Sequence, residues 1–230
     1  MKQLTEVDLE EVLQFMELRT FAYDILRRTF LEEPSKELVT QFQNGVINFF
    51  PFKEEVPQLK EGVELVERYF KTFKMEDNYE GLHWDYTKMF IGPYELPAPL
   101  WESSYVNKDG LLFQEETLIV RRLYLENCFE SLQQGREADD HLGLELDFMY
   151  QLTNIAIDLF KDKKLTELQK VLTDQDYFLR NHLLNWTPIF AEKVVEHAET
   201  DFYKGMVKIL IGYLTIDKAC LEEIFLEIDE

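Results

Sequence analysis

Cysteine is scarce in this chain. Its 230 residues include two, Cys128 and Cys220, and no CxxC pair. Because the two cysteines lie far apart in the sequence, free thiols are favoured over a disulfide. Each cysteine stands in an apolar pattern of helical spacing, which predicts two buried free thiols in a reducing compartment.

Long hydrophobic runs are also absent. The most apolar run, residues 206–216, contains Lys208 and is shorter than the roughly 20 residues needed to span a bilayer. The N-terminal stretch MKQLTEVDLEEVLQF is acidic and interrupted by polar side chains, which does not fit a secretory signal peptide. We therefore expect a soluble, cytoplasmic protein without membrane insertion.

The chain contains few positively charged residues. The 24 Lys and Arg residues face 45 Asp and Glu residues, for a formal net charge of −21. The negative electrostatic potential of such a protein repels phosphate backbones, so no nucleic-acid partner is expected. A cationic peptide or a basic protein surface is attracted instead. Solubility alone is the other explanation for this acidity.

Common catalytic signatures are missing. The chain contains no GxGxxG, GxxxxGK[ST] or GxSxG sequence and has only four serines, which argues against a nucleotide-binding loop and a serine hydrolase. Glu80 and His83 form a single ExxH, and His141 and Glu145 share a helix face. A helical metal-dependent enzyme using these residues is an alternative, but no second cluster completes a metal shell. We expect no cofactor.

Helical periodicity dominates the remaining sequence. Apolar residues recur at helical spacing, no segment alternates as a strand does, and 46% of the residues are hydrophobic, which is ample for one core. The pattern predicts an all-α fold, a single-domain bundle of about eight to ten helices over residues 1–230. The expected helices cover about residues 9–26, 36–47, 59–73, 79–91, 116–132, 142–159, 165–184 and 201–214.

Two segments depart from this pattern. Residues 91–113 form one long Pro-rich, aromatic connection, which indicates either a pre-ordered binding surface or a loop that plugs the core. Residues 135–141, GREADDH, precede a long helix, and Asp139 is the expected cap. One interpretation is that the carboxylates there serve only to stabilise the start of the helix, because the helix dipole favours negative charge at that end. The alternative is that they anchor a cationic ligand beside His141, and the charge of the His141 ring would then be adjustable near neutral pH.

Three motifs in order resemble one known family. They are YTKMFIGPYELPAPLWESSY at residues 86–105, DHLGLEL at 140–146, and FLRNHLLNW at 178–186 followed by Phe190 and Phe202-Tyr203. Together they are similar to the TorD/DmsD family of cytoplasmic molybdoenzyme chaperones, the redox-enzyme maturation proteins, and most similar to the dimethyl-sulfoxide reductase branch. The resemblance covers about residues 80–210, and the nitrate-reductase assembly branch is the alternative within the family.

The resemblance implies a non-catalytic function. It implies that the protein binds the twin-arginine leader of a molybdopterin oxidoreductase of the DMSO or TMAO reductase type, holds the precursor back from export and assists insertion of the molybdenum cofactor. Apart from the resemblance, the long connection at residues 91–113 is compatible with a monomer or with a helix-swapped dimer. Asp140 is the candidate partner of an arginine, and Asp140→Asn with His141→Ala is expected to weaken leader binding without harming the fold. The peptide-binding residues implied are Tyr86, Phe90, Tyr94, Trp101, Ser103, Tyr105, Asp140, His141 and Glu145.

Overall fold

The computed structural model describes residues 6–93, 95–107, 115–130 and 137–229, and within these ranges it contains helices and no strand. The predicted all-α bundle is therefore confirmed. The elements are α1 (Glu6–Phe30), α2 (Lys36–Gln43), η1 (Val46–Phe49), α3 (Pro57–Lys71), α4 (Met75–Tyr86), η2 (Thr87–Ile91), α5 (Ser103–Val106), α6 (Glu115–Glu126), α7 (Leu142–Lys161), α8 (Leu165–Phe178), η3 (Leu179–Leu183), α9 (Leu184–His197) and α10 (Asp201–Asp229).

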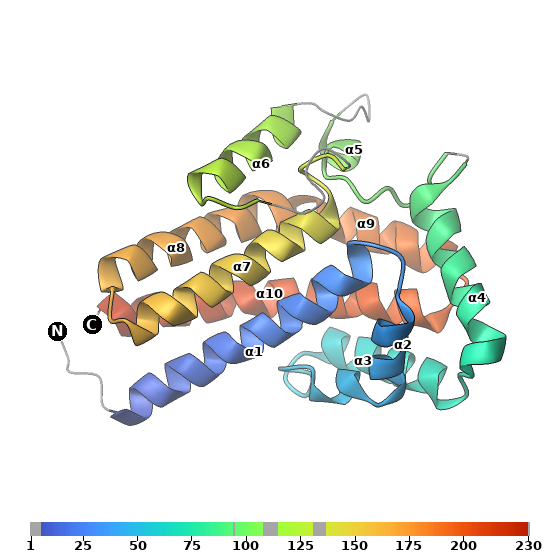
Figure 1. Cartoon of the computed structure of the whole chain (residues 1–230), viewed down its shortest axis with the longest axis horizontal. Helices are drawn as coiled ribbons and strands as arrows, with labels where there is room; N and C mark the ends of the chain where they lie inside the picture. Colours follow the sequence, from blue (N-terminus) through green and yellow to red (C-terminus); the bar gives the residue numbers. More distant parts are fainter. Residues whose placement is uncertain (1–5, 94, 108–114, 131–136, 230) are drawn as a thin grey trace.

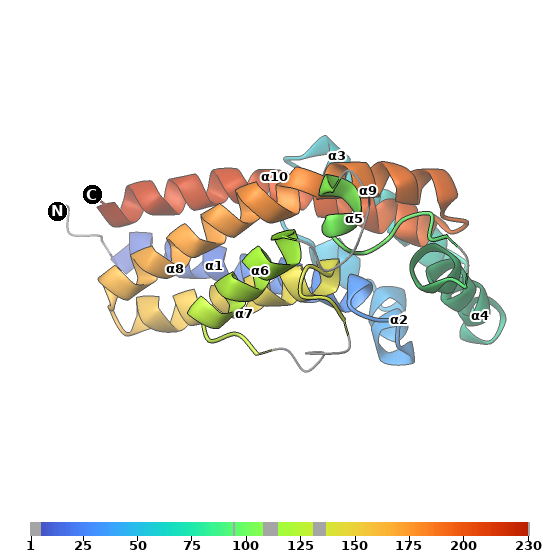
Figure 2. The same cartoon turned by 90° about the horizontal axis from the view of Figure 1, so that it is seen from above.

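The long helices set the shape of the molecule. α1, α7, α8 and α10 run along its length, α2, α3 and α4 gather at one end, and α6 lies over α7 and α8 (Figures 1 and 2). α1 packs along α7, and α10 packs against α3 and α9. The apolar faces of these helices form one core.

A buried ion pair fixes α1 to α10. The Arg19 guanidinium donates two hydrogen bonds to Asp217, at 2.6 and 3.0 Å, and both side chains are fully buried. The hydroxyls of Tyr23 and Tyr213 donate to the same carboxylate, at 2.7 and 3.2 Å. Four donated hydrogen bonds compensate the desolvation of the Asp217 charge, so the pair is tolerated in the core.

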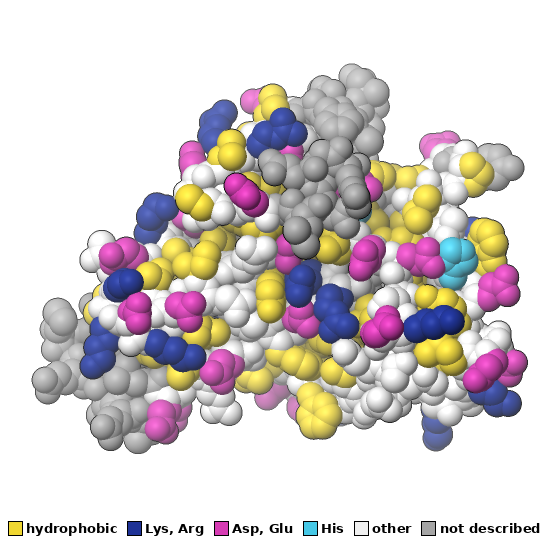
Figure 3. Space-filling model, viewed as in Figure 1, with side chains coloured by type: hydrophobic (Ala, Val, Ile, Leu, Met, Phe, Trp, Pro, Cys, Tyr) yellow, Lys and Arg dark blue, Asp and Glu magenta, His cyan; other side chains and the backbone are white. Residues whose placement is uncertain are grey.

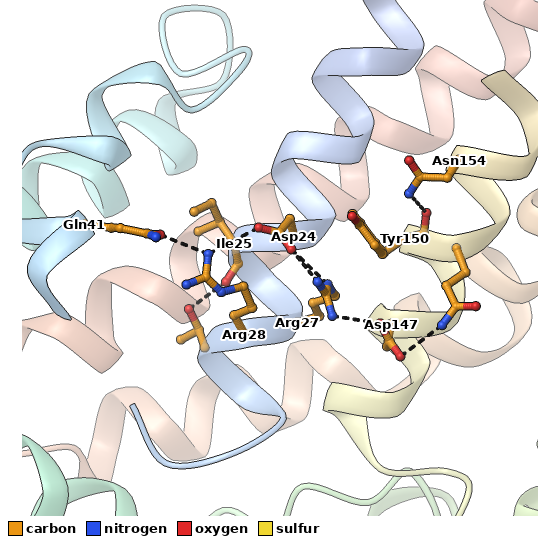
Figure 4. A network of polar contacts seen from close by, with 10 residues as sticks. Asp24, Ile25, Arg27, Arg28, Gln41, Asp147, Tyr150 and Asn154 are labelled. Carbon is orange, nitrogen blue, oxygen red and sulfur yellow. Dashed lines mark hydrogen bonds and ion pairs between the residues drawn. The ribbon is translucent and has the colours of Figure 1, made fainter. Parts of the chain in front are cut away.

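A second polar network fixes α1 to α7 (Figure 4). Arg27 donates to Asp24 on its own helix at 2.6 Å and to Asp147 on α7 at 3.0 Å, and its guanidinium lies 4.1 Å from the centre of the Tyr150 ring. At the start of α7, a β-carbon on Gly143 would overlap the backbone of Leu31. The missing side chain lets the C-terminal end of α1 approach the start of α7, and this contact positions the site described below.

Two π-helical turns lie inside the motifs. η2 ends at Ile91 and is followed by Gly92, whose φ of 91° favours glycine, and η3 joins α8 to α9. The sequence predicts that the helix of about residues 165–184 ends near Trp186 and Pro188. This prediction is wrong, because α9 continues through Pro188 to His197. The widened turn of η3 interrupts the regular hydrogen-bond ladder just before the proline, and the Thr187 hydroxyl donates to the Leu183 carbonyl at 2.7 Å.

Local predictions had mixed outcomes. Ser35 caps α2 by accepting a hydrogen bond from the Leu38 amide, as expected for this residue. Cys220 is buried, but Cys128 is exposed at a positive φ because α6 ends at Glu126, earlier than the apolar pattern indicated. Thr5, expected to precede the first helix as its cap, and Leu132, the expected end of the 116–132 helix, lie outside the described residues.

No helix in the described ranges is both long and apolar enough to cross a membrane.

Candidate functional site

The first two motifs meet in space. Trp101 and His141 form an isolated antiparallel β-bridge, 40 positions apart in the chain. The Leu142 amide donates to the Leu100 carbonyl at 2.7 Å, and the Glu102 amide donates to the Asp140 carbonyl at 3.0 Å. The Pro-rich connection is therefore paired with the segment that starts α7, a contact that helical periodicity gave no means of predicting.

A groove of about 370 Å³ opens beside this bridge. It lies between the end of α1, the π turn η2 and the start of α7. We call it the bridge groove. Its lining residues are Leu31, Glu32, Glu33, Tyr86, Phe90, Ile91, Leu100, Trp101, Glu137 and His141.

Aromatic side chains form the wall of the bridge groove. The rings of Tyr86 and Phe90 meet edge to face with centroids 4.9 Å apart, and Trp101 meets His141 in the same way at 5.8 Å. Tyr86 and Phe90 are anchored in the hydrophobic core, whereas Ile91 is 59% exposed. The wall is therefore rigid, and it offers apolar contact area that needs little reordering when a ligand binds.

Three carboxylates stand in the bridge groove. Burial raises the pKa of Tyr86, and the negative charges of Glu137, Glu32 and Glu33 raise it further, since all three lie near its hydroxyl. Burial also raises the pKa of Glu137, and the nearby Trp101 indole offsets part of this. Glu33 contacts Nδ1 of His83 on α4. Over α4 the surface shows acidic and hydrophobic side chains together, with a histidine among them (Figure 3).

Sequence reasoning did not assign these carboxylates to the site. Glu32 and Glu33 follow the C-terminal end of α1 and lie before the region of resemblance. A signal for them existed, because acidic side chains at a helix C-terminus are disfavoured by the helix dipole.

His141, not Asp139, caps α7, so the predicted cap is corrected. Its Nδ1 accepts a hydrogen bond of 3.1 Å from the Gly143 amide, so in the neutral ring the proton is on Nε2. Burial lowers the pKa of His141 to about 4, which contradicts the expectation of a charge adjustable near neutral pH. Asp139 pairs with Arg121 at 2.7 Å instead.

The protonation of His141 gives a first prediction. The unfolded imidazole has a pKa of about 6.5, so the unfolded state binds a proton that the native state rejects as the pH falls below that value. Relative to His141→Asn, which keeps a side-chain cap, the wild type should lose roughly 2 kcal/mol of unfolding free energy between pH 7 and pH 4.5. Urea unfolding of both proteins measures this, and parallel pH profiles would contradict it.

Asp140 is fully buried and its carboxylate is already occupied. Its Oδ2 accepts from the Ser103 amide and its Oδ1 from the Thr117 hydroxyl, each at 2.9 Å. It does not line the bridge groove, and Ser103 is buried beside it. Because both side chains hold local structure, we now expect Asp140→Asn with His141→Ala to destabilise the fold, in place of the expectation that the fold is unharmed.

Glu145 belongs to a second buried cluster. Its Oε2 accepts a hydrogen bond of 3.2 Å from the Trp186 indole, and the nearby Glu102 lies 2.8 Å from Nδ1 of His182. Burial, followed by the charges of Glu102 and Asp140, raises the pKa of Glu145 well above its ordinary value. Glu145 therefore lies inside the bundle and away from the bridge groove.

Tyr105 faces α9 rather than the bridge groove. Its ring stacks on Trp186 with centroids 5.2 Å apart, its hydroxyl donates to the Pro99 carbonyl at 2.7 Å, and the Lys193 ammonium lies 5.0 Å from its centre. Tyr94 lies outside the described residues. Of the nine residues predicted for peptide binding, the bridge groove brings together Tyr86, Phe90, Trp101 and His141.

The residues of the metal-enzyme alternative do not converge. In the described part of the chain, no three or more His, Cys, Asp or Glu side chains form a group able to hold a metal ion. His83 is paired with Glu33, and Glu80 accepts from the Trp84 indole at 3.4 Å.

Comparisons with known proteins point to one family. A family model described as "Nitrate reductase delta subunit" matches residues 53–192. The chain is 28% identical to the chaperone protein TorD of Vibrio parahaemolyticus, over 93% of this chain and 99% of the relative. It is 27% identical to the TorD of Photobacterium profundum, over 93% and 98%. A crystal structure of a putative redox enzyme maturation protein from Archaeoglobus fulgidus aligns with a TM-score of 0.48 at 19% identity, covering 87% and 93% of the two chains.

The fold and the bridge groove define an all-α protein with an acidic, aromatic-lined groove where its motifs meet. The chain belongs to the nitrate reductase delta subunit family, the family of redox-enzyme maturation chaperones to which the TorD proteins belong. The predicted family is thereby confirmed, and the assignment to its dimethyl-sulfoxide reductase branch stays a prediction.

Proposed function

We propose that this protein is a cytoplasmic chaperone that binds the twin-arginine leader of a molybdopterin oxidoreductase precursor. In this role it holds the precursor back from export, assists insertion of the molybdenum cofactor and catalyses no reaction of its own. The observation that carries the proposal is the bridge groove, which combines an aromatic wall with three carboxylates. A leader of this type is cationic next to an apolar stretch, and these two features complement the groove.

Binding would rest on two contributions. Guanidinium groups and carboxylates form charge-assisted hydrogen bonds of defined geometry, which supply specificity for arginine. The aromatic wall supplies desolvated apolar contact area. The net charge of −21 adds a long-range attraction that speeds encounter with a cationic peptide and weakens as salt is added.

The proposed client is a DMSO or TMAO reductase-type enzyme. TorD proteins are relatives over nearly their full length, which favours this branch. The name of the matching family model favours a nitrate reductase as the second candidate. Leader peptides from both types therefore belong in the test.

Calorimetric titration tests the proposal. The purified protein is titrated with leader peptides of its host's molybdopterin oxidoreductases, each paired with a version in which both arginines are glutamine. We expect one leader to bind, and its Gln-Gln version to bind at least about tenfold more weakly, because the carboxylates lose their charged partners.

Equal binding of the two versions would contradict recognition of the arginines, and would favour a surface that takes basic or apolar peptides generally. Absence of binding to every leader would overturn the proposed function.

A further inference from the structure

We propose that Glu32 and Glu137 are the carboxylates that receive the two arginines of the leader, one arginine each. This inference rests on the proposed function and assigns its specificity to residues outside the motifs. It also replaces Asp140 in the role that the sequence suggested for it.

The carboxylates near the bridge groove differ in whether another residue already binds them. Asp140 is fully buried and both of its oxygens accept hydrogen bonds, while Glu33 is held by His83. Glu32 and Glu137 are exposed, line the bridge groove, and have no Lys or Arg partner among the residues that the structure describes. They are therefore the groove carboxylates free to pair with an incoming cation.

The surroundings of Glu32 favour a cation. Glu32 stands directly beyond the C-terminal end of α1, a helix of 25 residues whose last carbonyl groups carry partial negative charge. An arginine at this position would pair with the carboxylate and with the helix end together. The repulsion between Glu32 and that helix end would then be relieved by the ligand, which strengthens binding.

The surroundings of Glu137 favour an arginine over a lysine. Its carboxylate lies beside the Trp101 indole, which is part of the groove wall. A planar guanidinium can stack on an aromatic ring while it donates to a carboxylate, whereas the compact ammonium of lysine lacks this geometry. Trp101 and Glu137 together would therefore select the side chain that the leader carries.

His141 supplies a third, independent contact point. The ring is only 4% exposed, it lines the bridge groove, and its Nδ1 is occupied by the Gly143 amide. The remaining Nε2–H is a donor with no acceptor among the described residues. A carbonyl oxygen of an extended peptide backbone is the group it would bind, so the donor would fix the peptide's register while the carboxylates bind its side chains.

Glu32 and Glu137 come from different parts of the chain. Glu137 lies within the region matched by the family model, residues 53–192, and Glu32 lies before it. The groove therefore combines a contact that the family region provides with one that belongs to the N-terminal part of this chain.

A double-mutant cycle tests the assignment. The full-length wild type, Glu32→Gln and Glu137→Gln are titrated with the leader that the wild type binds, and with two peptides in which one arginine or the other is glutamine. Each protein variant should bind the intact leader about tenfold more weakly. Each loss should disappear with one of the single-Gln peptides, a different one for each variant, because the partner charge is then already absent.

Glu17→Gln is the matched control, since it removes one exposed carboxylate from α1 away from the groove and changes the net charge equally. It should bind like the wild type. Thermal unfolding of all variants checks that the fold is intact.

The outcomes separate this assignment from the proposed function. If the wild type distinguishes the leader from its Gln-Gln version but both groove variants bind as it does, the assignment is overturned and the proposed function stands. If both variants weaken binding no more than Glu17→Gln, the effect is one of net charge and the assignment is again overturned. If the wild type binds no leader, both the assignment and the proposed function are overturned.

Discussion

Asp217→Ala is expected to lower the free energy of unfolding by about 3–5 kcal/mol. The substitution leaves the Arg19 guanidinium buried without a counter-charge and removes the acceptor of both tyrosine hydroxyls. Because α1 and α10 are joined through this carboxylate, their packing should loosen together. Urea unfolding at pH 7, followed by circular dichroism, measures the loss.

Two comparisons isolate the buried pair. Glu54→Ala breaks the exposed ion pair with Lys60 and should change stability by less than about 1 kcal/mol. Replacing both buried partners, Arg19→Met with Asp217→Leu, should restore much of the loss, because no charge is then left unpaired. An Asp217→Ala variant as stable as Glu54→Ala would show that the pair is not what fixes the two helices.

Asp140→Ala is expected to cost about 2–4 kcal/mol of unfolding free energy. Two buried donors, the Ser103 amide and the Thr117 hydroxyl, would lose their acceptor. These bonds attach α5 and α6 to the start of α7, so the damage should be greatest at the bridge between the two motifs. Urea unfolding measures the loss, and Thr117→Val, which removes one donor and leaves the carboxylate, should cost about 1 kcal/mol.

This prediction also decides what the aspartate of the DH motif does. If Asp140 is structural, leader affinity measured at a temperature where the variant is folded should fall far less than with Glu32→Gln or Glu137→Gln. If Asp140→Ala is nearly as stable as the wild type yet no longer binds the leader, Asp140 contacts the leader, and its assignment to the structural network is wrong.

The incorrect predictions of site residues have physical causes. Periodicity and motif spacing select residues by their position along the chain, and they carry no information on which side chains face a solvent-open groove. Tyr105 and Glu145 match the motifs as well as Trp101 and His141 do, yet they point into the bundle. The Asp139 cap was a reasonable inference from residue preferences, but Arg121 takes that carboxylate and His141 supplies the acceptor for the helix amide.

The sequence by itself determined the helical class, the acidic charge, the order of the three motifs and the family, because apolar spacing and motif composition are local properties. Tertiary structure alone decided which motif residues share a groove. The close approach at Gly143, the bridge between Trp101 and His141 and the end of α1 place Glu32, Glu33 and Glu137 around Tyr86. The bridge joins residues 40 positions apart, whereas Gly143 and Leu31 are 112 positions apart, and the packing of α1 on α7 brings them together.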